Sequence, residues 1–229
     1  DIKLLGNYAG TVYISGIVAI SNNYIRYYAI NAGDVDVDAQ IGESLIVGGM
    51  CSQGQYGATF LECKNTGNFT VSKNSVVGKA IYIGGMYGTY TDGTTFTFDK
   101  CLNSGNLTVA GVAGASDVAP DAENYNKEHS VFMGGLAGQT RNNGTKKYLN
   151  ITNGFINTGK IEFTGSNLHG QVAIGGIIGD AATDTSAWTG EIVNTGDIIF
   201  TGTYNTVGYA GGIFGRTTVP VANAIAHCK

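Results

Sequence analysis

The sequence predicts an all-β protein, a parallel β-solenoid (β-helix) of about five to six repeats of about 36 residues each. Three observations predict this fold: the glycine content, two short motifs that recur at that interval, and the alternation of apolar and polar residues around the motifs. Of 229 residues, 36 are glycine and 2 are proline, while 43% are hydrophobic and 13% are charged. A disordered chain has less apolar mass and more charge, and collagen has glycine at every third residue with abundant proline. The chain therefore folds, and it uses glycine at particular places.

The first motif, Asn-x-Gly-x-apolar, occurs five times. Its glycines are Gly33, Gly67, Gly105, Gly159 and Gly196. The residues two and four positions after each glycine are apolar, as in Val35 and Val37, whereas the residues between them are mostly polar. A period of two residues is typical of a strand with one buried face. Each copy of this motif therefore predicts a turn followed by a strand.

The second motif, apolar-Gly-Gly-apolar, follows each copy of the first. Its first glycines are Gly48, Gly84, Gly134, Gly175 and Gly211. The residues before it are apolar throughout, as in Ile81-Tyr82-Ile83. This predicts a second strand, which is covered on both faces or exposes an apolar stripe. The paired glycines predict a bend or a close approach of two backbone segments.

A short apolar strand cannot bury its face alone, but copies stacked in register form a continuous core. In such a stack, the asparagines of the first motif lie in line and hydrogen-bond along the axis. We expect this ladder to consist of Asn31, Asn65, Asn103, Asn157 and Asn194. The glycine two residues later is expected to supply a positive φ for the turn. The alternative fold is a kelch-like β-propeller, because Ile81-Tyr82-Ile83-Gly84-Gly85 resembles the end of a kelch blade, although a kelch period is near 50 residues.

The whole chain is predicted to be a single repeat domain that belongs to a longer protein. The predicted repeats lie near residues 1–33, 34–67, 68–105, 106–159, 160–196 and 197–229. No apolar stretch reaches the 18 or so residues of a transmembrane helix, so we expect no membrane insertion of this segment. The net charge of −4 and the scattered lysines argue against nucleic acid as a partner.

One family resemblance follows from these motifs. The run Gly134-Gly135-Leu136-Ala137-Gly138, with Gly154-Phe155-Ile156-Asn157-Thr158-Gly159-Lys160-Ile161 after it, resembles the GLUG-type repeat of bacterial surface proteins, adhesins and IgA-specific metallopeptidases. The same similarity runs from Gly84 to Leu107 and from Gly175 to Ile198, so it covers most of the chain. The resemblance implies an extracellular or cell-surface β-solenoid that acts as a stalk, an adhesin or a ligand-binding module. In those peptidases the repeats are not the catalytic part.

Candidate ligand-binding residues lie where the repeat pattern is broken. Gly105 and Gly134 are 29 residues apart, against 15 to 17 in the other copies, and a second insertion follows Gly134. Insertions in solenoids map to loops, often on the binding face, and these two are rich in groups that hydrogen-bond sugars or peptides. Tyrosines near the Gly-Gly strand form either a platform for sugar rings or a shield for the sheet. The candidates are Asp121, Glu123, Asn124, Tyr125, Arg141, Asn142, Lys146, Tyr87 and Tyr90.

The acidic residues offer a weak metal site. Asp34, Asp36 and Asp38 alternate with valines and so project to one face of one strand. They are interpreted as Ca²⁺ ligands or, with greater weight, as a solvated outer face. No other cofactor is expected, and no residue is assigned as catalytic, because the sequence contains no nucleophile elbow, P-loop or His-Glu-x-x-His motif.

The cysteines and histidines are interpreted as structural residues. Cys63 and Cys101 share one inward column of neighbouring repeats, so they form a buried pair of free thiols or a disulfide, with the free pair favoured. The histidines (His129, His169, His227) are expected on the surface. The predicted function is that of a non-enzymatic bacterial module for adhesion or carbohydrate or protein binding, with a glycan, a host or bacterial surface protein and other domains of the same chain as partners. The alternatives are a polysaccharide-cleaving β-helix lyase or glycosidase, and a purely structural stalk.

Overall fold

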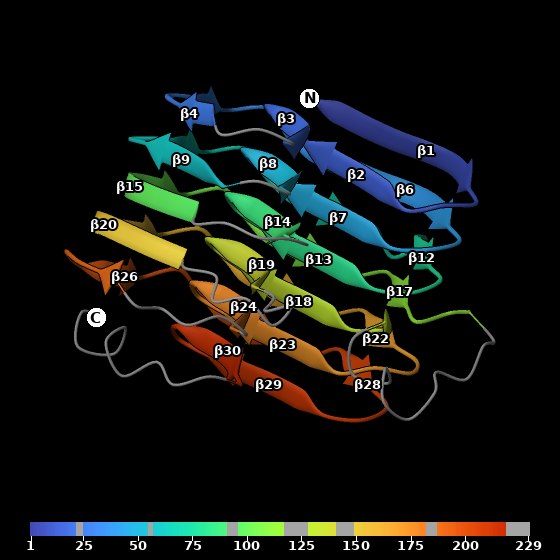
Figure 1. The fold of residues 1–229 in the computed structure, drawn as a ribbon. Coiled ribbons are helices and arrows are strands. Elements are labelled where there is room, and N and C mark those ends of the chain that lie inside the picture. The colour runs from blue at the N-terminus through green and yellow to red at the C-terminus, as the bar shows by residue number, and fades with distance from the viewer. Residues whose placement is uncertain are drawn as a thin grey trace.

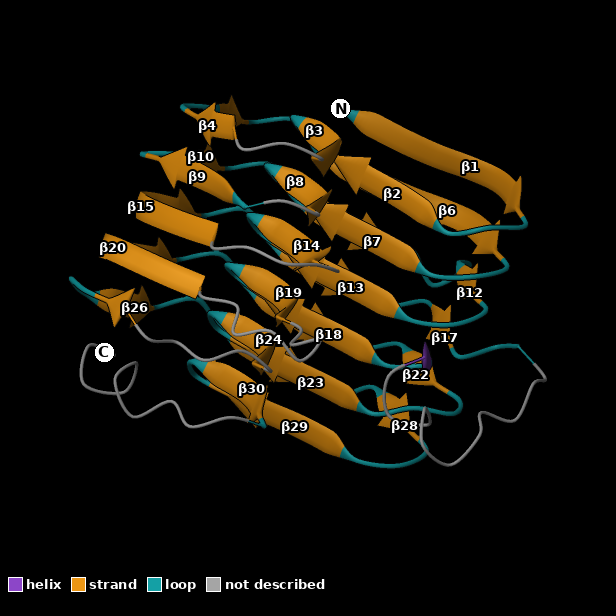
Figure 2. Ribbon diagram, in the orientation of Figure 1, coloured by secondary structure: helices purple, strands orange, loops and turns teal. Residues whose placement is uncertain are grey.

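The computed structural model describes residues 1–21, 25–54, 57–90, 96–116, 128–140, 149–181 and 187–218. The strands stack in parallel as a β-solenoid of about five turns, with the first turn at the top of Figure 1. Within the described ranges all regular elements are strands, apart from one helical residue at Glu128 (Figure 2). The predicted solenoid is confirmed. The kelch-like propeller is wrong, because propeller blades are antiparallel and the strands of neighbouring repeats here pair in parallel.

Each turn passes through four parallel sheets, which we name A to D in the order of the chain. Sheet A contains β1 (Ile2–Tyr8), β6 (Val35–Ile41), β11 (Phe69–Val71), β12 (Val76–Val77), β16 (Leu107–Val109), β17 (Val112–Ala113), β21 (Ile161–Phe163), β22 (Ser166–Asn167), β27 (Ile198–Phe200) and β28 (Thr203–Tyr204). Sheet B contains β2 (Val12–Ser15), β7 (Leu45–Gly48), β13 (Ile81–Gly84), β18 (Val131–Gly134), β23 (Val172–Gly175) and β29 (Gly208–Gly211).

The other two sheets complete each turn. Sheet C contains β3 (Val18–Ser21), β8 (Cys51–Gly54), β14 (Tyr87–Tyr90), β19 (Ala137–Thr140), β24 (Ile178–Ala181) and β30 (Phe214–Thr217). Sheet D contains β4 (Ile25–Tyr27), β5 (Ile30–Asn31), β9 (Ala58–Leu61), β10 (Lys64–Asn65), β15 (Phe96–Asn103), β20 (Leu149–Asn157), β25 (Ala187–Trp188) and β26 (Ile192–Asn194).

Two separate hydrophobic cores run along the axis. The first contains inward residues of sheets A and B, such as Val35, Phe69 and Val47. The second contains inward residues of sheets C and D, including Phe60 and Phe98, whose rings stack with centroids 4.8 Å apart. Burying one such side chain stabilises a fold by roughly 1.5–3 kcal/mol. Each turn buries several of them against the turns beside it, so their contributions to stability accumulate along the stack. The alternation of apolar residues after the first motif therefore predicted the correct inward faces.

The predicted asparagine ladder is present and separates the two cores. Each asparagine side chain donates from Nδ2 to Oδ1 of the next one along the axis, at 2.7 to 2.8 Å. The same Nδ2 donates to the carbonyl of the glycine two residues later, as from Asn103 to Gly105 at 3.0 Å. Asn65, Asn103 and Asn157 have no exposed surface. Buried amides persist because each is satisfied by its neighbours.

The Gly-Gly motif packs against this ladder, so the two glycine motifs meet in space. A Cβ atom on the second glycine of the Gly-Gly motif would collide with the ladder, as Gly85 would with the side chain of Asn103. A Cβ atom on the first glycine would collide with backbone across the bend, as Gly84 would with the carbonyl oxygen of Tyr87. The Gly-Gly motif is therefore required because sheet B, sheet C and the ladder meet there without room for side chains.

The role predicted for the glycine of the Asn-x-Gly motif is wrong. The described glycines with positive φ are Gly6, Gly114, Gly154 and Gly190, and none of them belongs to this motif. A Cβ atom on Gly67 would instead collide with the carbonyl oxygen of Gly33 in the preceding turn, and the same holds at Gly105, Gly159 and Gly196. The motif requires glycine because successive turns approach closely, and not because the backbone is left-handed.

A second ladder lies on the outer side of the same corner. The Asp34 carboxylate accepts the backbone N–H of Asn68 at 2.7 Å, and Asn68 Oδ1 accepts that of Asn106 at 3.0 Å. Asn106 Oδ1 in turn accepts the backbone N–H of Lys160 at 2.9 Å. In three successive turns the side chain of this column accepts a hydrogen bond from the next turn. These bonds fix the register between neighbouring strands of sheet A on its outer side.

The three described cysteines, Cys51, Cys63 and Cys101, are buried and not in disulfides, and we call them the core thiols. Cys63 and Cys101 are neighbours on adjacent turns, as predicted, since Leu102 N donates to Cys63 O at 3.0 Å. A hydrogen bond between their thiols, together with burial, raises the pKa of Cys101. Burial raises the pKa of Cys51 to about 12. Cys51 and Cys101 are therefore neutral thiols, whereas the hydrogen bond with Cys101 lowers the pKa of Cys63. All three cysteines fill core positions, and so do the three methionines (Met50, Met86, Met133).

Candidate functional site

The outer faces of sheets B and C carry two columns of side chains that face each other across the Gly-Gly bend. The column of sheet B is apolar and largely aromatic: Tyr13, Ile46, Tyr82, Phe132, Ala173 and Tyr209. The column of sheet C begins with Ile20 in the first turn and is polar in every later turn: Gln53, Thr89, Gln139, Asp180 and Arg216. We call the space between them the B–C groove. Sheet B is thus apolar on both faces, as its continuous apolar strands predicted.

The B–C groove holds a cavity of about 260 Å³ at the first three turns. Both columns contribute to its wall, with the rings of Tyr13 and Tyr82 from sheet B and the side chains of Gln53 and Thr89 from sheet C. The rest of the lining is Thr11, Glu43, Ser44, Ile46, Lys79 and Glu128. Apolar ring surface together with a few convergent polar groups is the composition typical of small-molecule sites.

Two side chains in the polar column of sheet C have a buried atom without a hydrogen-bond partner. Thr89 is 4% exposed and Gln139 is 2% exposed, yet Thr89 Oγ1 and Gln139 Oε1 have no hydrogen-bond partner. A buried polar atom without a partner costs about 1–3 kcal/mol, so such atoms are uncommon in folded proteins. Thr89 lines the cavity, and Gln139 lies in the same column one turn further along.

Among the described residues that line the cavity, acidic side chains outnumber basic ones. Lys79 Nζ lies 2.6 Å from Glu43 Oε2, and both side chains are about one-third to two-fifths exposed. The hydrogen bond that Lys79 donates to Glu43 raises the pKa of Lys79, and the charges of Glu43 and Glu128 act in the same direction. Lys79 is therefore an ammonium ion at neutral pH, and the two carboxylates outnumber it.

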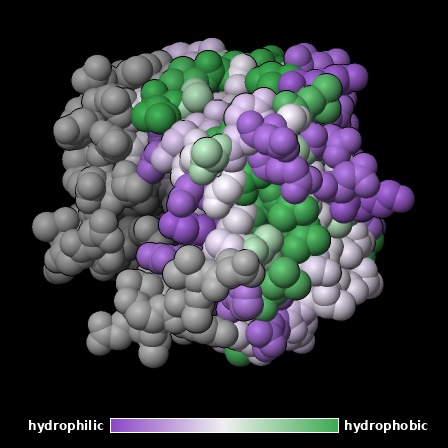
Figure 3. Space-filling model, turned by 90° about the vertical axis from the view of Figure 1, so that its right-hand side faces the viewer, coloured by the Kyte–Doolittle hydropathy of each residue, from purple (hydrophilic) through white to green (hydrophobic). Residues whose placement is uncertain are grey.

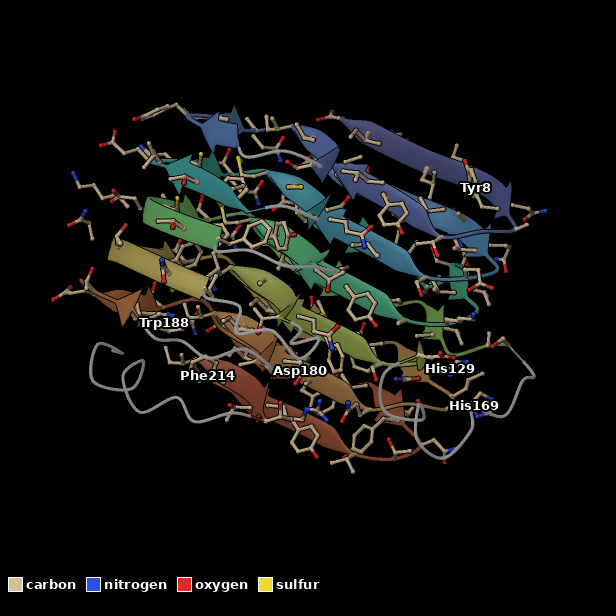
Figure 4. The ribbon with its side chains drawn as sticks, viewed as in Figure 1. Tyr8, His129, His169, Asp180, Trp188 and Phe214 are labelled. Carbon is tan, nitrogen blue, oxygen red and sulfur yellow. The ribbon has the colours of Figure 1, made fainter. Side chains whose placement is uncertain are left out.

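A polar bridge fills the groove beyond the cavity. Arg216 Nε and Nη2 donate to the two carboxylate oxygens of Asp180 at 2.7 and 3.0 Å, and Arg216 Nη1 donates to Gln171 Oε1 at 2.8 Å. Gln139 Nε2 donates to Asp180 Oδ2 at 3.0 Å. The Arg216 guanidinium also lies over the ring of Phe132, 5.8 Å from its centroid. Asp180 (Figure 4) is fully buried, and its charge is matched by this two-point contact.

A pair of histidines lies beside the start of sheet B. His129 and His169 are neighbours at one end of the sheets (Figure 4), with ring centroids 6.1 Å apart. The expectation of a surface histidine is wrong for His129, which is 2% exposed because the turn carrying Gly170 packs directly on its backbone. Its Nε2 lies 3.0 Å from Ser116 Oγ, and burial, followed by the charge of His169, lowers its pKa. His129 is therefore a neutral ring at neutral pH, and its hydrogen bond holds Ser116 in place.

A larger and more open depression of about 550 Å³ lies at the ends of the sheet A strands, next to the corner between sheets A and B. It is lined by Asn7, Tyr8, Ala9, Gln40, Ile41, Gly42, Val76, Gly78, Ala115 and Ser116. The side of the molecule that carries it shows a hydrophobic band bordered by hydrophilic side chains (Figure 3). Its main polar groups are engaged elsewhere, since Tyr8 Oη donates to Leu5 O and Gln40 Nε2 to Asn74 O. The B–C groove instead contains buried polar atoms without a partner, so it is the better candidate.

Most of the predicted ligand-binding residues lie outside the described residues. These are Asp121, Glu123, Asn124, Tyr125, Arg141, Asn142 and Lys146, together with the side chain of Tyr90. The prediction that Tyr87 is exposed to a ligand is wrong, because its position in the strand points inward. Tyr87 is 2% exposed, packs on Phe96 in the core and donates to Gly54 O at 3.3 Å.

The predicted Ca²⁺ ligands do not form a cluster. Asp36 and Asp38 are exposed on the outer face of β6, and Asp34 and Asp38 accept hydrogen bonds from Asn68 and Ser72 of the next turn. Among the described residues, no group of three or more His, Cys, Asp or Glu side chains is placed to hold a metal ion. Asp34 instead belongs to the outer ladder, and Asp38 accepts its hydrogen bond from Ser72 in a separate column.

The sequence contained a clue to the B–C groove. The residue five positions after the first glycine of each Gly-Gly motif is polar in all five copies: Gln53, Thr89, Gln139, Asp180 and Arg216. A polar column beside an apolar strand marks a face that is not part of the core. The contribution of Glu43 and Lys79 has no such pattern, because it depends on how the corner between sheets A and B is folded.

Comparison of the chain with protein-family models, with curated proteins and with solved structures finds no match. The resemblance to the GLUG-type repeat therefore stays a prediction. None of the helical structure in the described part of the chain is long and apolar enough to cross a membrane.

Proposed function

We propose that this chain is a non-enzymatic bacterial repeat module, either secreted or anchored to the cell surface, that binds glycans through the B–C groove. The observation that carries the proposal is the cavity in which two tyrosine rings lie beside a buried threonine hydroxyl without a partner. Tyrosine offers a flat apolar face and a polar tip, which suits a sugar ring whose faces are apolar and whose rim is covered with hydroxyls. Sugar hydroxyls both donate and accept, so they complement carboxylate, amide, ammonium and hydroxyl groups alike.

The chemistry of the cavity favours binding over cleavage. Glycoside cleavage uses one carboxyl group as an acid and another as a base or nucleophile. Here Glu43 is held by Lys79, and the raised pKa of Lys79 leaves it protonated and unsuited to act as a base. A stalk would have no reason to keep an unpartnered hydroxyl beside a cavity, since an apolar residue of the same shape is no less stable.

A glycan array tests the proposal with two variants of the cavity. Tyr13→Ala removes a partly exposed ring, and its control is Tyr8→Ala, an exposed tyrosine of the other depression. We expect wild type to bind a defined set of glycans, with affinity about tenfold lower in Tyr13→Ala and unchanged in Tyr8→Ala.

The second variant, Thr89→Val, removes only the hydroxyl, and its control is Thr108→Val on the outer face of sheet A. The expected loss of affinity is about threefold to tenfold, without loss of stability, because valine has the same shape and no unsatisfied atom. Absence of binding to every glycan would refute the proposal and favour the stalk. Binding of a surface protein at these same residues would favour the protein-binding alternative.

A further inference from the structure

Among the described residues, the B–C groove is closed from the fourth turn on. The cavity is lined by residues of the first three turns and by Glu128, and by no residue of β18 or of the described strands after it. The bridge described above begins directly beyond it. Arg216 and Asp180 belong to sheet C, whereas Gln171 immediately precedes β23 of sheet B, so the contact joins the two walls of the groove.

The space beneath the bridge is filled. Phe132 and Ala173, which form the apolar wall at the fourth and fifth turns, have no exposed surface, and Gln139 on the polar wall is 2% exposed. At the third turn the apolar wall is still accessible from the cavity, since Tyr82 lines it. A chain that lies along the groove therefore stops at the fourth turn.

We infer that the B–C groove recognises the end of a glycan chain and not its interior. The inference rests on the proposed function and adds to it the part of the ligand that is bound. A cavity of about 260 Å³ lies just below the roughly 300–1,000 Å³ of sites that enclose a drug-sized molecule, so it accommodates only the last residues of an oligosaccharide. The blind end excludes an internal segment, which needs an exit on both sides.

The charges of the cavity restrict the chemistry of that end. Among the described residues that line the cavity, Glu43 and Glu128 outnumber Lys79, whose ammonium is already paired. Like charges brought together in an enclosed site are unfavourable, so a terminal sugar with a carboxylate or sulfate is rejected. The ligand end is therefore a neutral or amino-bearing sugar.

Binding stoichiometry on soluble chains tests the inference. The probes are linear malto-, cello-, xylo-, manno- and chito-oligosaccharides of increasing length, their soluble polymers of defined length, and cyclodextrin as a chain without ends. Isothermal titration calorimetry measures how many protein molecules bind each chain and how the Kd depends on length. We expect one protein per chain end at any length, a Kd that changes less than about twofold once the cavity is filled, and no binding to cyclodextrin.

The outcomes separate the two proposals. Several protein molecules along one polymer chain, or binding to cyclodextrin, would overturn the inference and leave the proposed function intact. Binding that is equally strong in Tyr13→Ala and wild type would show that the glycan occupies another surface, which overturns the inference together with the proposed site. No binding to any probe would contradict the proposed function, and the inference would fall with it.

Discussion

Replacing one asparagine of the inner ladder with alanine is predicted to destabilise the solenoid strongly. Asn103 is fully buried, donates to Asn157 Oδ1 at 2.7 Å and to Gly105 O at 3.0 Å, and accepts from Asn65 Nδ2 at 2.8 Å. Asn103→Ala removes all three bonds and leaves Asn157 Oδ1 without its donor from the preceding turn. Each buried group left unsatisfied costs about 1–3 kcal/mol, and the lost side chain leaves a small void. We expect the free energy of unfolding to fall by about 3–5 kcal/mol.

Urea unfolding followed by circular dichroism measures this change, with Asn106→Ala as the matched control. Asn106 lies in the same turn but is exposed, and its side-chain oxygen accepts one hydrogen bond, from Lys160 N at 2.9 Å. A single bond at an exposed site is worth about 0.5–1 kcal/mol. Equal losses in the two variants, or a loss below about 1 kcal/mol in Asn103→Ala, would refute the idea that the ladder stabilises the core by satisfying buried amides.

Three further predictions follow from the packing. Gly85→Ala, whose Cβ atom would collide with the ladder, should lower the free energy of unfolding by about 2–4 kcal/mol, whereas Gly10→Ala, which meets no atom within 4 Å, should change it little. The lowered pKa of His129 means that the unfolded chain binds a proton more readily than the folded one. Stability should therefore be complete above the ordinary histidine pKa and fall by up to about 1.4 kcal/mol per pH unit below pH 6.5, and a flat urea midpoint between pH 7.5 and 5 would contradict this. The core thiols should react with a thiol reagent only as fast as the protein unfolds, measured in a Cys228→Ser background, and a burst of modification in native buffer would disprove their burial.

Periodicity carried most of the fold prediction. The two glycine motifs and the alternating columns gave the solenoid, the inward faces and the asparagine ladder, because a repeat shows the same physical position several times over. The prediction failed where one position was interpreted without its neighbours in space. The glycine of the first motif was assigned a positive φ, but its constraint is the carbonyl oxygen of the preceding turn, one whole repeat away in sequence.

The candidate site was harder to predict than the fold. Tyr87 and Tyr82 look alike in the sequence, yet Tyr87 points into the core between sheets C and D, and Tyr82 points into the B–C groove. The bend at Gly84 and Gly85 reverses which face of the chain is inside, and the sequence does not state the angle of that bend. The polar column after the bend was visible in the repeat alignment, but its partners across the groove were not.

The sequence by itself determined which residues repeat, which of them are buried and how the turns stack, because stacking in register requires the same residue types at the same position of every turn. The tertiary structure decided what the bends bring together. It placed the Gly-Gly motif against the asparagine ladder and the tyrosines of sheet B opposite the polar column of sheet C, and it closed their groove with Arg216, Asp180 and Gln171. Those contacts join residues of different turns and sheets, so they depend on angles between strands that periodicity cannot specify.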